Sequence, residues 1–216
     1  MKRSIAAVLA ALAFVTAGFS AAPMPDVLVK DTTKQILELL KANRPVYEKD
    51  HAKLYEMVYE HVLPHFDFKV MSRAVLGRYW REATDDQRKR FMQEFQNLLV
   101  RTYATALLKY TNEEIVYLPF NAGAAEKTAT VKTEVKLSGG GPPVPINFSF
   151  YRSESGWRVY DLQIDGISLV ANYQSTYASK IKNEGIDALI ASMAQAKNDE
   201  SETPVAGGKK GAAAKK

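Results

Sequence analysis

The sequence predicts an α+β fold in which helices cover one face of a curved antiparallel sheet of about four strands. Apolar residues recur at helical spacing through the first half of the chain and again after Asp165-Gly166. Between residues 114 and 164 the spacing drops to two, as in strands that bury one face. Single strands do not alternate with helices there, which argues against a parallel sheet.

Helices are expected where apolar residues repeat every three or four positions between start and stop signals. Pro45 and Pro64 predict the ends of the first two, because proline disfavours helix in the residue before it. Asp67 can cap the third and Gly77 can end it, and Thr84-Asp85-Asp86-Gln87 is a capping box that opens the longest helix. The expected helices cover residues 26–43, 48–63, 67–76, 84–110, 168–184 and 186–197.

Four strands are expected in the segment of two-residue spacing. In the third of them, Ile146, Phe148 and Phe150 share one face. Gly139-Gly140-Gly141-Pro142 and Ser153-Glu154-Ser155-Gly156 are turns that join neighbouring strands antiparallel. The expected strands cover residues 115–118, 128–137, 144–151 and 157–164.

Both ends of the chain are expected to lie outside the folded domain. A basic start, an apolar run and then small residues are typical of a secretory signal peptide over residues 1–22, cleaved after Ser20 or Ala22. Residues 204–216 hold little apolar surface and are expected to form a flexible Lys/Gly/Ala tail. A single domain is therefore expected over residues 23–203, located in the periplasm of a Gram-negative bacterium.

The net charge of the chain is +5, from 29 Lys and Arg against 24 Asp and Glu. Such a balance is compatible with a nucleic-acid or anionic-membrane partner. Two of the positive charges lie in the signal peptide and four in the tail, so residues 23–203 carry −1. We expect no nucleic-acid partner, and at most a transient contact of the tail lysines with a membrane surface. Cysteine is absent, which excludes disulfides, thiolate metal sites and cysteine nucleophiles.

Few patterns indicate catalysis or metal binding. His61 and His65 are four apart, but Pro64 ends the helix that would bring both rings to one face. Asp161 and Asp165 would lie ~13 Å apart along a strand that rises about 3.3 Å per residue, too far to share a proton. The chain contains no G-x-S-x-G motif and no phosphate-binding loop. We expect no catalytic residue, no metal and no cofactor.

Two stretches of sequence form a pattern that goes beyond composition. The first stretch holds Phe66-Asp67-Phe68, Met71, Arg73, Leu76-Gly77, Tyr79-Trp80, Ala83-Thr84, Gln87, Phe91 and Phe95. The second holds residues 157–161, 166–170, Asn172-Tyr173, Ile181 and 185–190. Together with the signal peptide, these stretches resemble, over residues 23–197, the MlaC or toluene-tolerance family, the periplasmic phospholipid carriers of the Mla pathway. One departure is Gln174 after Asn172-Tyr173, where relatives usually have arginine.

The resemblance implies an NTF2-like cone, in which helices and a curved sheet enclose a deep apolar cleft for lipid acyl chains. It implies a glycerophospholipid ligand and two partners. The partners are an inner-membrane ABC transporter complex, with its substrate-binding subunit, and an outer-membrane lipoprotein–porin complex. Transfer of lipid between these complexes is expected to maintain the lipid asymmetry of the outer membrane. Candidate headgroup contacts at the mouth of the cleft are Arg73, Arg78 and Arg101. Candidate cleft residues are Met71, Leu76, Tyr79, Trp80, Phe91, Phe95, Leu99, Tyr103, Phe148, Phe150, Tyr160, Leu162 and Val170.

Two other classes of function remain compatible with the sequence. An NTF2-like enzyme would act on a small hydrophobic substrate through one carboxylate buried in its cavity, with a strongly shifted pKa. A non-catalytic periplasmic adaptor would instead have a solid core and a flat exposed apolar patch. A cavity, its volume and its polar groups separate these alternatives.

Overall fold

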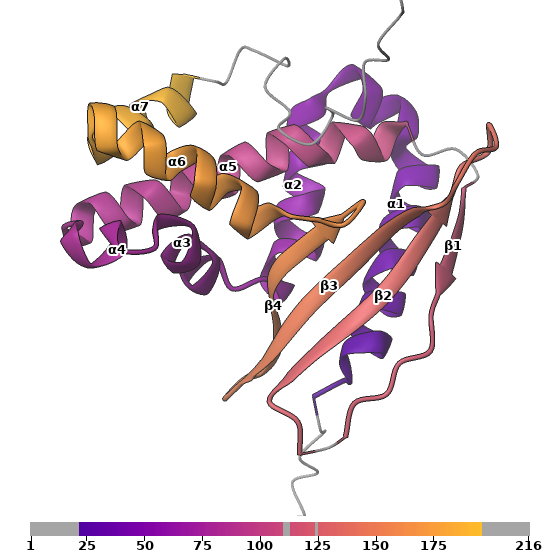
Figure 1. Ribbon diagram of the computed structural model, residues 1–216. Coiled ribbons are helices and arrows are strands. Elements are labelled where there is room, and N and C mark those ends of the chain that lie inside the picture. The colour runs from indigo at the N-terminus through magenta and orange to yellow at the C-terminus, as the bar shows by residue number, and fades with distance from the viewer. Residues whose placement is uncertain (1–21, 110–112, 124, 196–216) are drawn as a thin grey trace, which may run out of the picture.

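The computed structural model describes residues 22–109, 113–123 and 125–195 of the 216-residue chain. Helices lie on one face of an antiparallel sheet and beyond one of its edges, which confirms the expected α+β class (Figure 1). The expected signal peptide, apart from Ala22, and the expected tail lie outside the described residues. The helices are α1 Pro25–Lys49, α2 His51–His61, the short 3-10 helix η1 Leu63–His65, α3 Phe68–Leu76, α4 Tyr79–Glu82, α5 Asp85–Leu108, α6 Leu169–Glu184 and α7 Ile186–Gln195.

Helix α1 continues past Pro45, which corrects the helix end expected just before that proline. A proline inside a helix removes one backbone hydrogen bond and crowds the preceding turn. Tertiary contacts on both sides of it offset that cost, because Arg44 donates to the carbonyl of Leu108 at 2.6 Å and Tyr47 is buried. Asp50 then caps α2 by accepting a backbone N–H two residues on, so the second helix begins later than expected.

The capping signals of the later helices are confirmed. Asp67 accepts the backbone N–H of the third residue after it at 2.9 Å, and Gly77 ends α3 with a φ of +53°. Thr84 and Gln87 exchange both hydrogen bonds of the capping box at the start of α5. The short helix α4 was not expected from the sequence, and it fills the segment between α3 and α5.

The sheet has five strands in the order β1-β2-β3-β4-β5, all antiparallel, rather than about four. The additional strand, β5, has two residues and returns from β4 through Asp165-Gly166. The φ values of these two residues are +51° and +79°, as a two-residue hairpin turn requires. The strands are β1 Glu114–Tyr117, β2 Thr128–Lys136, β3 Val144–Ser153, β4 Gly156–Ile164 and β5 Ile167–Ser168.

Buried apolar side chains of the described residues form three clusters. One lies between α1, α2 and α5, and another joins Val29 of α1 to the sheet residues Val131, Phe150, Trp157 and Val159. The third, the large helical cluster, lies among α3, α5, α6 and α7, so much of the packing joins helices to one another and does not involve the sheet. The large helical cluster comprises Met71, Val75, Leu76, Phe91, Phe95, Leu98, Leu99, Tyr173, Tyr177, Ile181, Leu189, Ile190 and Met193.

Candidate functional site

The face of the sheet that α1 contacts is apolar across four strands. Val131 of β2 lies opposite Phe148 of β3, and Leu162 of β4 lies on the other side of Phe148. Directly paired residues of antiparallel strands share a face. The same pairing joins Ile115 of β1 to Val135 of β2. This inner face is therefore mostly apolar, and its polar member Thr133 is buried and donates its hydroxyl to the carbonyl of Ile146 at 2.8 Å.

A bulge in β4 keeps the inner face apolar along the whole strand. Phe150 pairs with Val159, whereas the preceding residue of β3 pairs with Asp161, so Tyr160 is the extra residue. The inward positions change there from the odd residue Val159 to the even residue Leu162. Without the bulge, strict alternation would turn Asp161 inward. A bulge also bends the strand and increases its local twist.

Burial of the apolar side chains on the inner face decreases along β3 from Phe150 toward Val144. Phe150 and Val131 are each 1% exposed, because Val29 and neighbouring residues cover them. Farther along β3, Phe148 and Ile146 are only half-buried. Apolar surface that remains in contact with water is a common mark of a binding site. The open sheet face consists of the half-buried residues Ile115, Val135, Val144, Ile146, Phe148, Leu162 and Ile164.

A groove of about 350 Å³ separates α1 from the edge strand β1. The half-buried Leu37, Ile115 and Tyr117 make an apolar floor, and charged side chains of α1 stand exposed above it. Because Ile115 pairs with Val135, this floor continues into the open sheet face. The α1–β1 groove is lined by Thr33, Lys34, Leu37, Glu38, Lys41, Ile115 and Tyr117.

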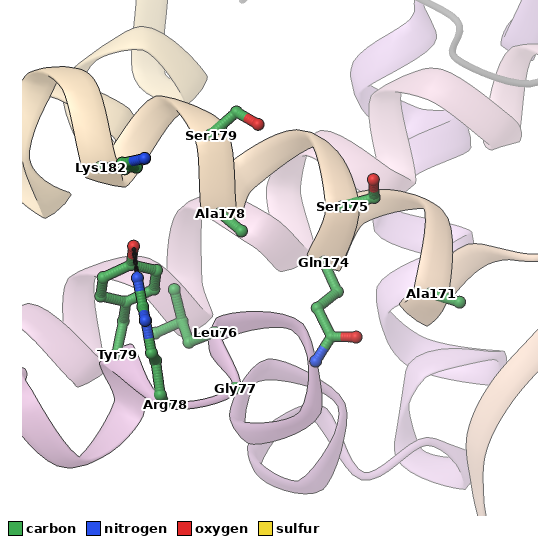
Figure 2. Close-up of a pocket in the computed structure, with 10 residues that line it drawn as sticks. All are labelled: Leu76, Gly77, Arg78, Tyr79, Ala171, Gln174, Ser175, Ala178, Ser179 and Lys182. Carbon is green, nitrogen blue, oxygen red and sulfur yellow. Dashed lines mark hydrogen bonds between the residues drawn. The ribbon is translucent and has the colours of Figure 1, made fainter.

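A second groove, of about 550 Å³, lies between the α3–α4 turn and α6 (Figure 2). Figure 2 shows Arg78 beside the ring of Tyr79, opposite small side chains of α6. The Arg78 guanidinium lies 4.8 Å from the ring centre and donates to the Tyr79 hydroxyl at 2.8 Å. Gln174 donates to the Ala74 carbonyl at 2.9 Å and so ties α6 to α3. The lining residues are Leu76, Gly77, Arg78, Tyr79, Ala171, Gln174, Ser175, Ala178, Ser179 and Lys182.

The structure places the helical members of the predicted cleft in or against the large helical cluster. The rings of Phe91 and Phe95 stack with centres 5.6 Å apart, and Tyr173 meets Phe95 edge-on at 5.3 Å. Burial raises the pKa of Tyr103, at the border of this cluster, to about 12. Met71, Leu76, Phe91, Phe95 and Leu99 lie within the cluster, and Tyr79, Trp80, Tyr103 and Val170 are half-buried against it.

The members of the predicted cleft that come from the sheet occupy three environments. Phe148 and Leu162 lie on the open sheet face, and Phe150 is buried beneath α1. Tyr160 is the bulge residue, and its ring centre lies 6.3 Å from that of Tyr151. The structure therefore brings together on the open sheet face only two residues of the predicted cleft.

The predicted headgroup arginines lie apart from one another. Arg73 is exposed on α3 and Arg78 lines the groove beside α6. Arg101 donates to the carbonyl of Met193 at 3.0 Å and so joins α5 to α7. The charged residues beside the α1–β1 groove are different ones, which sequence reasoning missed. Their spacing on α1, at positions 34, 38 and 41, was the available signal, because it places them on one helix face.

Asp161 and Asp165, which we considered for catalysis, and the helix cap Asp67 have structural roles. Asp161 accepts the Ser168 hydroxyl at 2.6 Å and the Val170 N–H at 3.0 Å, which fixes the start of α6. Asp67 accepts the hydroxyl of Tyr151, and this bond raises the pKa of Tyr151 to about 12. Asp165 lies in the β4–β5 turn.

The described residues contain little buried polar chemistry. Ser72 and Thr133 are the buried polar side chains among them, so no carboxylate there is fully buried. His61 is hydrogen-bonded to Gln35 at 3.1 Å, and burial together with Arg158 lowers the pKa of His65. Within the described ranges, no three His, Asp or Glu side chains are grouped as a metal site.

Comparison with known proteins identifies the family. The family model described as MlaC protein matches residues 30–195, most of the chain. The chain belongs to the MlaC family. No helix in the described ranges combines the length and the hydropathy needed to cross a membrane.

The MlaC-family relatives include proteins named for phospholipid transport and for toluene tolerance. The chain is 26% identical over 173 residues to the intermembrane phospholipid transport system binding protein MlaC of Haemophilus influenzae, which covers 79% of this chain and 81% of that protein. It is 26% identical over 212 residues to the toluene tolerance protein ttg2D of Pseudomonas putida, covering 94% and 96% of the two chains. A phospholipid-binding protein from Ralstonia solanacearum, solved in complex with a phospholipid, matches with a TM-score of 0.74 and 29% identity, covering 80% of this chain and 96% of that one.

Proposed function

We propose that this MlaC-family protein binds a glycerophospholipid by its acyl chains and carries it through the periplasm. The observation that carries the proposal is the open sheet face, a half-buried apolar ladder reached through a groove. The phospholipid seen in the Ralstonia solanacearum relative supports the same class of ligand. As part of this proposal, the signal peptide directs export of the protein and is cleaved off before the start of the domain.

The energetics of lipid transfer require such a surface. Two acyl chains contain about 30 methylenes, and at ~0.8 kcal/mol each their exposure to water costs about 24 kcal/mol. A carrier therefore has to cover the tails, whereas the polar head can stay in water. The tails can lie on an apolar surface formed by Phe148, Leu162, Ile146 and Ile164. The backbone N–H and C=O groups beneath it are paired within the sheet, so they place no unpaired polar group against the tails.

In this proposal the carrier exchanges lipid with two membranes. It takes up or delivers its lipid at an inner-membrane ABC transporter complex and at an outer-membrane lipoprotein–porin complex, and so maintains the asymmetry of the outer membrane. The name of the Haemophilus influenzae relative, which places it in an intermembrane phospholipid transport system, supports this role.

The two alternative functions fit the described residues less well. A cavity enzyme needs a buried carboxylate with a shifted pKa. Among the described residues, the carboxylate with a shifted pKa is Asp187, which is exposed. Its pKa is lowered because it accepts a hydrogen bond from Arg90 at 2.7 Å. An adaptor needs a flat apolar patch, whereas the half-buried apolar residues here lie on the inner face of a curved sheet. Within the described ranges, neither alternative therefore finds the feature that would support it.

The proposal is tested by lipid extraction and lipid transfer. We expect the purified protein to release phospholipid into organic solvent, detected by mass spectrometry, and to take up labelled phospholipid from vesicles. Leu162→Gln on the inner face should reduce uptake strongly, whereas Gln163→Ala on the opposite face of the same strand should not. A purified protein that holds no phospholipid and takes up none from vesicles would contradict the carrier function.

A further inference from the structure

The charges beside the α1–β1 groove alternate in sign along one face of α1. Lys34, Glu38 and Lys41 are all exposed there, one helical turn apart. None of the three forms an ion pair with another described residue. The next lysine toward the N-terminus differs, because Lys30 pairs with Asp26 at 3.9 Å and lies over the Tyr117 ring. The groove thus presents two ammonium groups and one carboxylate that are not ion-paired within the described part of the chain.

The groove also has an apolar route into the fold. Leu37 and Ile115 lie on its floor, and Ile115 is paired with Val135 on the open sheet face. A chain of methylenes that lies along Leu37, Ile115 and Val135 passes over apolar side chains from the solvent edge of β1 to the inner face of the sheet. One end of the groove therefore suits a polar head and the other suits an acyl chain.

We propose that the α1–β1 groove seats the headgroup of the carried lipid, and that this headgroup bears both a phosphate and an amine. The phosphate lies against Lys34 or Lys41, and the amine lies against Glu38. The two lysines are seven positions apart, about 10.5 Å along the helix axis, with the carboxylate between them. A row of charges that alternates in sign therefore faces a headgroup that holds both a negative and a positive charge. The inference rests on the proposed carrier function and names its preferred ligand class.

A competition between two lipids tests the carboxylate. Vesicles with equal amounts of phosphatidylethanolamine and phosphatidylglycerol are offered to the protein, and mass spectrometry gives the ratio of the two lipids bound. Glu38→Gln should lower the ethanolamine-to-glycerol ratio about threefold, the size expected for an exposed ion pair. Glu56→Gln, an exposed carboxylate of α2 outside the groove, is the matched control and should leave the ratio as in the wild type.

A second comparison tests the lysines. The double variant Lys34→Gln/Lys41→Gln should reduce phospholipid uptake about two- to tenfold at low salt, and less at high salt because the ions screen the charges. Its uptake of diacylglycerol, which has no phosphate, should equal that of the wild type. Lys53→Gln on α2 controls for the general loss of positive charge, and thermal unfolding verifies that each variant is folded.

The outcomes separate the two proposals. If the wild type carries phospholipid but Glu38→Gln leaves the lipid ratio unchanged, the headgroup site is overturned and the carrier function stands. Equal losses of diacylglycerol and phospholipid uptake in the lysine variant would likewise overturn the headgroup site. A wild-type protein that carries neither lipid overturns the carrier function itself.

Discussion

Two phenylalanines distinguish the packed core from the surface that we propose to bind lipid. Phe95 is fully buried in the large helical cluster, with ring centres 5.6 Å from Phe91, 5.3 Å from Tyr173 and 6.5 Å from Tyr177. Phe148 is half-buried on the open sheet face. Replacing each by alanine removes the same atoms, so any difference in effect reports the difference in surroundings.

The expected costs follow from that difference. Phe95→Ala leaves a closed cavity and should lower the free energy of unfolding by about 3–5 kcal/mol, the range for a buried phenylalanine. For a domain of this size, that corresponds to a fall of about 6–20 °C in the unfolding temperature. Phe148 packs against the cluster of Val131 and Phe150 but is only half-buried, so its truncation leaves a less closed cavity and we expect about 1–2 kcal/mol. Lipid uptake should show the opposite order, with the larger loss in Phe148→Ala.

Urea unfolding of the lipid-free variants, followed by circular dichroism, measures the stabilities, and vesicle transfer measures uptake. If Phe95→Ala does not fold, Phe95→Leu provides a smaller truncation at the same site. A folded Phe95 variant that has lost lipid uptake at nearly unchanged stability would refute the assignment of this residue to the core. A Phe148→Ala variant with wild-type uptake would refute the open sheet face as the surface that holds the acyl chains.

Three further predictions concern the framework around the site. Asp161→Ala removes both bonds that hold the start of α6 and should cost about 2 kcal/mol, seen as faster amide hydrogen exchange there than in α5. Gly77→Ala places a Cβ at a φ of +53° and 3.1 Å from the Gln174 amide nitrogen, and should lower the thermal midpoint, while unchanged stability would contradict the strain. The raised pKa of Tyr151 means that the folded state holds the phenol proton more tightly than the unfolded state. The stability that this proton gives to the folded state is present below pH 10 and is lost as the pH rises toward about 12. Tyr151→Phe should remove that part of the pH dependence in urea titrations, and an unchanged profile would contradict the role of the bond to Asp67.

The local signals in the sequence predicted the elements well. Three of these signals act within a few residues: the capping box at Thr84, the glycine after α3 and the Asp165-Gly166 turn. Because residues adjacent in the chain determine their geometry, the sequence is enough to predict it. The two-residue alternation of β3 likewise identified an apolar face correctly. The bulge at Tyr160 in β4 was not expected from the sequence, because the pairing partner decides whether a change in the apolar alternation becomes a bulge.

The sequence by itself therefore determined the class of fold, the order of its elements and the family. The tertiary structure decided which apolar residues are core and which form a surface, because hydrophobic periodicity is the same in both cases. It also carried α1 through Pro45, joined Arg101 to the carbonyl of Met193 and set lysines rather than arginines beside the groove that leads to the sheet. Each of these outcomes depends on contacts between residues far apart in the chain, which neither spacing nor composition encodes.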